Sequence, residues 1–112
     1  MKYDDNNIFA KILRGEIPCE KIYEDDFVLS FYDINPQKKI HALVIPKGKY
    51  IDLDDFSSKA TPEEMAGLLK GINTVAKKLG ISVDTGKGYR ALTNISEDGG
   101  QEVPHLHFHL FG

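Results

Sequence analysis

The last nine residues of the chain, PHLHFHLFG (104–112), alternate histidine with large apolar residues. His105, His107 and His109 occupy every second position of this stretch. Successive side chains of a β-strand point to opposite faces of the sheet. The alternation therefore predicts a half-buried strand over 103–111, which turns its apolar residues to the core and all three imidazoles to the other face.

The sequence upstream of this stretch predicts two helices. Apolar residues at helical spacing indicate a first helix, which is capped by Asp5 or Asn6 and ends at Gly15. The clearer helix is predicted over 62–79, where Thr61 is a suitable N-cap and apolar residues follow the helical period. Both helices are amphipathic in pattern, so each is expected to cover a sheet.

Four further strands are expected before the histidine stretch. Runs rich in β-branched and aromatic residues predict strands within 19–23, 27–33, 40–46 and 88–95. Residues 52–60 are expected to form a short turn or a helical piece. Five strands with hairpin-like connections and two helices predict an α+β fold built on a five-stranded antiparallel sheet.

Length, charge and cysteine content restrict the function. A chain of 112 residues suits a single domain over 1–112. A net charge of −3 argues against a nucleic-acid partner, and the longest apolar run, ALVI (42–45), is too short to span a membrane. The single cysteine, Cys19, cannot form an intramolecular disulfide, so a reducing, cytoplasmic location is expected. A small phosphorylated ligand remains compatible with this composition.

Three roles are open to a strand that presents three imidazoles on one face. Neighbouring histidines in a strand lie about 6–7 Å apart and the outer two about 13 Å apart. Ligand atoms on one zinc ion lie within about 3–4 Å of each other, so two of these histidines could bind one ion, with His41 as a further ligand, but all three could not without severe distortion. Imidazole is also a nucleophile, acid and base near neutral pH, which suits phosphoryl chemistry. A purification tag or an exposed polar face is disfavoured by the interleaved leucine and phenylalanine.

The final stretch resembles the histidine-triad motif, His-φ-His-φ-His-φ-φ, in which φ is apolar. Further segments resemble, in the same order, the Hint branch of the histidine triad (HIT) superfamily; among them are IFAKILRGEIPC (8–19), FYDINPQ (31–37), HALVIPK (41–47), GYRALTN (88–94) and DGGQEVPHLHFHL (98–110). The resemblance implies a HIT-like fold, in which a five-stranded antiparallel sheet with two helices dimerises into a ten-stranded sheet. It also implies hydrolysis of purine nucleoside 5′-phosphoramidates, derivatives of AMP or GMP, by a homodimer. No cofactor is expected, and no metal is expected because the strand spreads the imidazoles too far for one ion.

The same resemblance implies catalytic roles for the four histidines. His107 would be the nucleophile: a backbone carbonyl would accept its Nδ1–H and leave Nε2 free to attack the α-phosphorus. His109 would contact phosphate oxygens and protonate the leaving group. His105 and His41 would form a pair that orients the nucleophile and relays protons. Without the resemblance, His41 would be interpreted as a surface histidine at a strand end.

The resemblance also implies a nucleotide-binding site. Asp33 would bind both ribose hydroxyls, although the sequence alone fits a turn aspartate equally well. Asn94 would donate to a phosphate oxygen, and the loop 99–103 would present backbone N–H groups to the phosphate. The other residues implied to contact the nucleotide are Ile8, Phe9, Phe31 and Ile34 around the base, for which core packing is the alternative, and Gln101, Glu102 and Val103 beside the phosphate.

Three functions therefore follow from the sequence. The first is hydrolysis of purine nucleoside phosphoramidates through a nucleotidyl-histidine intermediate. The second is hydrolysis of dinucleoside polyphosphates, the activity of a sister branch that lacks this N-terminal pattern. The third is a nucleotide-binding interaction module with incidental turnover. Glu102 stands where some Hint proteins have serine, and its carboxylate would repel an anionic leaving group or help to protonate an amine.

Overall fold

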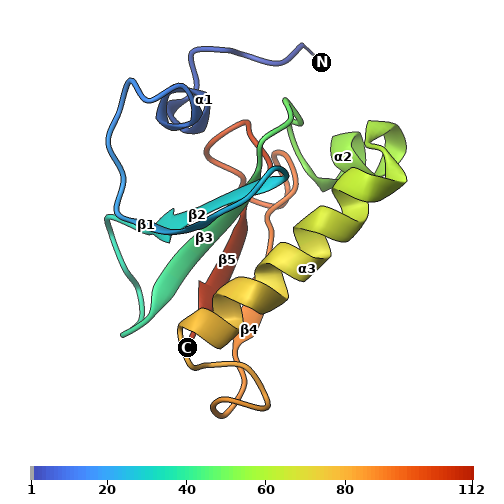
Figure 1. Ribbon diagram of the computed structural model, residues 1–112. Coiled ribbons are helices and arrows are strands. Elements are labelled where there is room, and N and C mark those ends of the chain that lie inside the picture. Colours follow the sequence, from blue (N-terminus) through green and yellow to red (C-terminus); the bar gives the residue numbers. More distant parts are fainter. Residues whose placement is uncertain (1) are drawn as a thin grey trace.

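The computed structural model describes residues 2–112 and contains a sheet with helices on both of its faces (Figure 1). The helices are α1 (Ile8–Leu13), α2 (Leu53–Lys59) and α3 (Pro62–Lys78). The strands are β1 (Lys21–Glu24), β2 (Val28–Tyr32), β3 (His41–Pro46), β4 (Arg90–Leu92) and β5 (Phe108–Phe111).

All five strands pair in one antiparallel sheet, as the sequence predicts, and their order is β1-β2-β3-β5-β4. β2 and β3 pair along their length, from Val28 opposite Pro46 to Tyr32 opposite Ala42. β5 lies between β3 and β4, and this places His109 opposite Leu43. The histidine-bearing strand is therefore an inner strand, held on both sides.

The last strand is shorter than the alternation predicts. Only Phe108–Phe111 pairs with its neighbours, whereas residues 103–107 form an irregular segment before it. In this segment the backbone N–H of Leu106 donates to the carbonyl of Tyr50, so the chain is tied to a loop rather than to a strand. The alternation of faces nevertheless persists, because Leu106 and Leu110 are fully buried in the same core.

The structure contains three helices. The third is α2, the helical alternative expected for residues 52–60, which begins after Asp52, whose carboxylate accepts the N–H of Asp55 at 2.8 Å. α3 begins as predicted, with a capping box between Thr61 and Glu64. The cap of α1 is Asn7 rather than Asp5 or Asn6, and its side chain accepts the N–H of Ala10. A polar residue at the first turn of each helix thus fixes where it starts.

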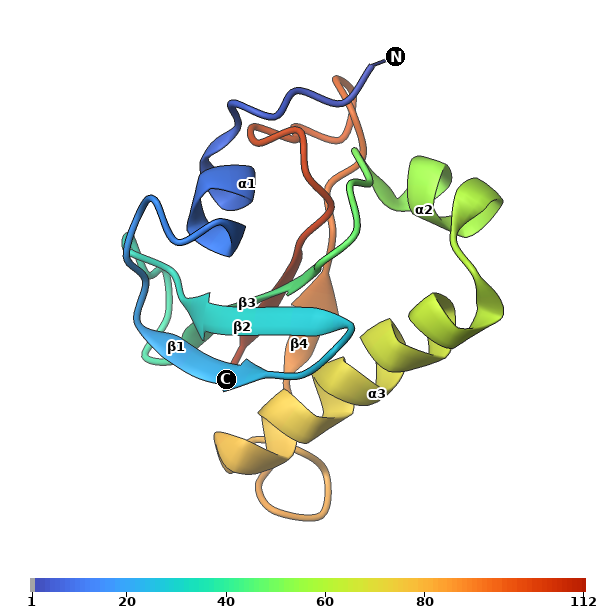
Figure 2. The same cartoon turned by 45° about the horizontal axis from the view of Figure 1, so that its top comes forward.

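The sheet separates two apolar cores. α3 covers one face and α1 lies over the other (Figure 2). The core beneath α3 includes Val44 and Leu110 of the sheet, and the core beneath α1 includes Leu43 and Phe9. Since Leu43 lies opposite His109, the imidazoles belong to the face that α1 covers. The short helix α1 therefore decides what can approach the histidines.

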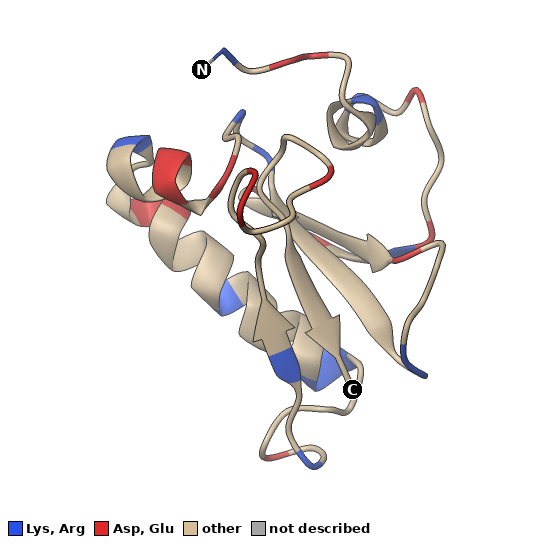
Figure 3. Ribbon diagram, turned by 180° about the vertical axis from the view of Figure 1, so that it is seen from behind, with Lys and Arg blue, Asp and Glu red and all other residues tan. Residues whose placement is uncertain are grey.

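Charged residues are dispersed over the surface. Seen from behind the molecule, lysines and arginines do not gather on one face, and acidic residues mark α2 and the loop that follows β4 (Figure 3). None of the helices within residues 2–112 combines the length and apolar character that a membrane crossing requires.

Candidate active site

The four histidines gather on the α1 side of the sheet. His105 and His107 are almost fully buried, and His41 is buried at the first residue of β3. The ring centroids of His107 and His109 lie 5.1 Å apart, and those of His41 and His109 lie 5.2 Å apart. The sequence predicts a shared face for the triad, but it does not predict that two of its members are enclosed by protein.

One hydrogen bond to the ring of His107 fixes its tautomer. Its Nδ1 lies 2.7 Å from the carbonyl oxygen of His105, which can only accept, so Nδ1 carries the proton. Among residues 2–112 no group bonds its Nε2, and no fully enclosed side-chain nitrogen or oxygen lacks a partner. Nε2 must therefore open to a cavity with its lone pair available, which is the condition for a nucleophilic imidazole.

His105 does not form the expected pair with His41. Its Nε2 lies 2.9 Å from the carbonyl oxygen of Pro46, and its Nδ1 lies 2.6 Å from the hydroxyl of Tyr3. Both ring nitrogens are thus occupied by groups outside the histidine cluster. Its backbone carbonyl, rather than its ring, is the part that touches His107.

His41 instead pairs with His109. The N–H of Gln37 donates to Nδ1 of His41, which places the His41 proton on Nε2. This Nε2–H faces Nδ1 of His109 at 2.9 Å and a carboxylate oxygen of Asp33 at 3.4 Å. Because Nδ1 of His109 accepts, neutral His109 carries its own proton on Nε2. The arrangement supplies a proton donor on His109, which lines the same polar cavity as His107.

Burial keeps the triad uncharged. Removal from water lowers the pKa of His105 to about 4, and the positive field of His107 acts in the same direction. Burial, with the fields of His107 and His41, also lowers the pKa of His109 to about 4. The pKa of His107 is lowered by burial too, against the opposing pull of the Asp33 and Glu102 carboxylates. At neutral pH the imidazoles are therefore available as bases and nucleophiles.

Two cavities adjoin beside the histidines. The apolar cavity, of about 220 Å³, lies between α1 and β2, and the polar cavity, of about 200 Å³, contains His107 and His109. The residues that line both are Phe9, Asp33, Leu43 and Val103. A larger open hollow of about 450 Å³ lies between β1, the turn that follows it and α3, but no histidine lines it. The chemistry therefore belongs to the two smaller cavities.

The structure brings the residues expected around the base to the apolar cavity. Phe9 and Phe31 are buried and form its floor, with their rings 5.7 Å apart and edge to face. Ile8 is 40% exposed and Ile34 85% exposed, so these two lie at the rim. Phe9 and Phe31 therefore both pack in the core and line the cavity.

The loop before the triad is arranged differently from the expectation. The N–H groups of Gly99, Gly100 and Gln101 donate to carbonyls of the loop itself, so they are not available to a phosphate. The Gln101 side chain also braces the loop, since its amide donates to the carbonyl of Ile51 at 2.6 Å. Gln101 does not line the polar cavity, whereas Asn94, Glu102 and Val103 do. The N–H groups of the two glycines thus close the turns of the loop, and contact of the Glu102 and Val103 N–H groups with a phosphate stays a prediction.

Three residues that contact the histidines were not identified as site residues from the sequence. Gln37 lines the polar cavity and fixes the His41 tautomer through its backbone N–H. The Thr93 hydroxyl donates to the carbonyl of His107 at 2.8 Å, and Tyr3 bonds His105. Thr93 could have been suggested by its place beside Asn94. No sequence pattern indicates a role for Tyr3, because it is 102 positions from its partner.

A metal ligand set is also brought together. Ligand atoms of Asp33, His41 and His109 all lie within 4.8 Å of one another. This set differs from the one considered from the sequence, because it draws one residue from the triad and two from elsewhere. The hydrogen bond between His41 and His109 accounts for their approach without an ion. The absence of a metal requirement stays a prediction.

An antiparallel α+β sheet whose inner strand delivers alternating histidines beside a two-part cavity is the arrangement of a histidine-triad protein. The HIT domain family model matches residues 14–112. An uncharacterised HIT-like protein of Azospirillum brasilense is 56% identical over 109 residues, which cover 97% of this chain and 87% of that protein. The chain therefore belongs to the HIT family.

Solved structures resemble the chain over nearly its full length. A HIT family hydrolase from Clostridium thermocellum superposes with a TM-score of 0.86 at 38% identity, covering 97% of this chain and 91% of the hydrolase. A histidine triad nucleotide-binding protein from Candida albicans superposes with a TM-score of 0.81 at 33% identity, covering 94% of this chain and 73% of that protein. The fold is thus shared with HIT proteins that carry these descriptions.

Proposed function

We propose that this protein hydrolyses purine nucleoside 5′-phosphoramidates through a nucleotidyl-histidine intermediate. The observation that carries the proposal is the pair of joined cavities, with Asp33 where they meet and Nε2 of His107 opening into the polar one. A base in the apolar cavity, a ribose at Asp33 and a phosphate at the histidines would occupy them in that order. The similarity to a HIT family hydrolase and to a nucleotide-binding relative supports this assignment.

The reaction has two displacements at phosphorus. In the first, Nε2 of His107 bonds to the α-phosphorus, the P–N bond of the substrate breaks, and the leaving nitrogen takes a proton from Nε2 of His109. In the second, water bonds to phosphorus, the bond to His107 breaks, and a proton of the water returns to His109. The Nε2–H of His41, which donates to Nδ1 of His109, stabilises the negative charge that His109 develops as it gives up its proton, and the Asp33 carboxylate lies 3.4 Å from the same nitrogen of His41.

Glu102 favours an amine as the leaving group. Its carboxylate lines the polar cavity, where it would repel a second phosphate group and attract a developing ammonium. This side chain therefore supports phosphoramidates over dinucleoside polyphosphates.

Turnover measurements test the proposal. Adenosine 5′-phosphoramidate and diadenosine tetraphosphate would be compared at equal concentration, with a chelator present because no step needs a metal. We expect a higher kcat/KM for the phosphoramidate. The reverse preference would favour the dinucleoside polyphosphate hydrolase, and nucleotide binding without turnover of either would favour the interaction module.

We further propose a cytoplasmic homodimer. β4 has a strand neighbour on one side only within residues 2–112, because β5 is its single partner in the sheet order. Antiparallel pairing of β4 with its copy would join two sheets into one of ten strands and cover the free edge of β4 in each copy. The single cysteine supports a reducing location.

A further inference from the structure

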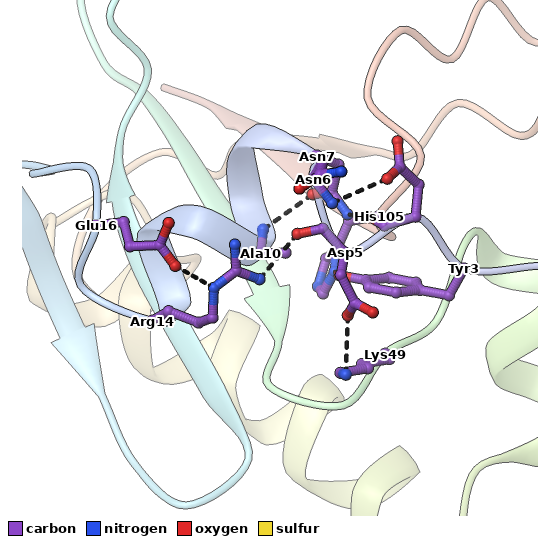
Figure 4. Close-up of polar contacts among 10 residues, drawn as sticks. Tyr3, Asp5, Asn6, Asn7, Ala10, Arg14, Glu16, Lys49 and His105 are labelled. Carbon is purple, nitrogen blue, oxygen red and sulfur yellow. Dashed lines mark hydrogen bonds and ion pairs between the residues drawn. The ribbon is translucent and has the colours of Figure 1, made fainter.

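The segment before α1 lies across the histidine cluster. We call residues 2–7 the N-terminal arm. The arm is pinned at Asp5, whose carboxylate lies 2.8 Å from the Lys49 ammonium and whose carbonyl accepts from Arg14 at 2.8 Å (Figure 4). This anchoring places Tyr3 against His105, with the two rings 5.6 Å apart at 73°. The arm thus brings a hydroxyl to a histidine from the far end of the sequence.

The direction of the Tyr3 hydrogen bond follows from the other bonds of His105. The Pro46 carbonyl can only accept, so Nε2 of His105 is the protonated nitrogen. Nδ1 of the neutral ring then has only a lone pair, and the Tyr3 hydroxyl must donate to it over 2.6 Å. His105 is 0% exposed, so water cannot replace this donor without a rearrangement.

The next bond in the chain reaches the proposed nucleophile. The carbonyl of His105 accepts Nδ1–H of His107 at 2.7 Å. The orientation of that carbonyl depends on the His105 residue, whose ring is fixed at both nitrogens by Pro46 and Tyr3. If Nδ1 of His105 lost its donor, the buried ring would have to turn or take up a proton, and either change would disturb the His105 carbonyl.

We propose that Tyr3 is a positioning residue for His107: its hydroxyl fixes the His105 ring, and the His105 carbonyl then holds His107 in the tautomer whose Nε2 is free. The inference rests on the proposed role of His107. It gives the N-terminal arm a part in the reaction, although Tyr3 touches neither cavity. The arm would act through geometry, without contact with the substrate.

The test removes one oxygen atom. Tyr3→Phe keeps the aromatic ring that packs on His105 and removes only the donor. Tyr23→Phe is the matched control, because it also removes a tyrosine hydroxyl bonded to a side chain, at 2.8 Å from Asp25, on a strand remote from the histidines. Imidazole ¹⁵N spectra of both variants report the protonated nitrogen of each histidine, and kcat and KM for adenosine phosphoramidate are measured in parallel.

We expect the Nδ1 signal of His105 to move toward that of an unbonded nitrogen in Tyr3→Phe, and the His107 signals to show a mixture of tautomers. One net hydrogen bond corresponds to a fall in kcat of about threefold to tenfold, with KM almost unchanged. Tyr23→Phe should leave both the spectra and kcat as in the native protein. Thermal unfolding of both variants separates any general loss of stability from the effect on the site.

Other results would overturn the inference. A fall in kcat with unchanged histidine spectra would show that Tyr3 acts otherwise, and altered His105 spectra with native His107 signals and kcat would break the link between the two histidines. If the native protein does not turn over the phosphoramidate, the proposed function fails. The His107 tautomer in Tyr3→Phe would then still decide whether Tyr3 positions that ring.

Discussion

At the scale of single residues, hydrogen bonds to backbone groups decide which ring nitrogen of His107 and of His41 carries the proton. The His105 carbonyl leaves Nε2 of His107 available, and the N–H of Gln37 turns the Nε2–H of His41 toward His109. The motif predicts that the histidines alternate, but it does not predict which groups form hydrogen bonds with them. Each partner lies in a loop or at a strand end whose path is set by the folded chain.

The depressed pKa values predict the acid side of the pH profile. Burial disfavours the charged imidazolium, so His107 stays neutral below the ordinary histidine pKa of 6.5. A neutral His107 is required for attack, and kcat/KM should therefore fall only when the pH drops through its lowered pKa. We expect the acid limb of the plot of kcat/KM against pH to have its midpoint below 6.5. The kcat/KM of His107→Ala is subtracted at each pH as the background. A midpoint at or above 6.5 would contradict this description.

Asp33 should recognise the ribose. One carboxylate oxygen accepts the N–H of Asn35 at 2.8 Å, and Asp33→Asn can keep this turn contact through its amide oxygen. Loss of a charge-assisted hydrogen bond should weaken AMP binding by roughly tenfold or more. Binding of 2′,3′-dideoxy-AMP should change much less, as calorimetry would show. Asp25→Asn, at another turn, is the control; equal losses for both ligands would reduce Asp33 to a turn residue.

At the scale of elements, α1 is the smallest helix and carries the greatest share of the apolar cavity. Its six residues include Ile8 and Phe9, and the helix starts at the Asn7 cap. A helix this short has little stability of its own, so its cap and its packing on the sheet hold it in place. Changes to the cap should therefore reach the ligand.

Asn7→Ala tests the cap of α1. The loss of a buried N-cap should cost about 0.5–2 kcal/mol in the free energy of unfolding, and it should weaken AMP binding by roughly twofold to tenfold because the cavity wall loosens. Thr61→Ala removes the cap of α3, which does not line the cavity, and should cost similar stability with unchanged affinity. Urea unfolding and AMP titration measure both quantities. Equal affinities in the two variants would show that α1 does not depend on its cap.

The sequence predicts the elements well where a short-range pattern specifies them. The β1–β2 hairpin, β3 and α3 follow directly from apolar periodicity and the Thr61 capping box. The prediction fails for 103–107, where alternating residues are not paired in the sheet. There the fold ties Leu106 to the loop at Tyr50, a contact across 56 positions that no local pattern encodes.

At the scale of the whole molecule, residues from both ends of the chain meet at the histidines. Tyr3 and His105 are separated by 102 positions, and His41 and His109 by 68. Most of the candidate residues were predicted from the resemblance to HIT proteins, because the resemblance implies the topology of the fold. Tyr3 lies outside the segments on which that resemblance rests.

The proposed dimer makes a prediction about assembly. An unpaired β4 edge on each of two copies should associate with twofold symmetry. Light scattering coupled to size exclusion should give the mass of two chains at micromolar concentration. A mass of one chain under these conditions would contradict the proposed ten-stranded sheet.

His107 should become covalently nucleotidylated during turnover, and a rapid-quench experiment can trap and locate that adduct. The native protein is mixed with adenosine 5′-phosphoramidate, quenched in base to preserve the phosphorus–nitrogen bond, and mapped by mass spectrometry. We predict one AMP on His107, lost on acid treatment, and none in His107→Ala, whose turnover should fall by on the order of 10⁴-fold. An adduct on His105, on His109 or on another residue, or substantial turnover by His107→Ala, would contradict the account.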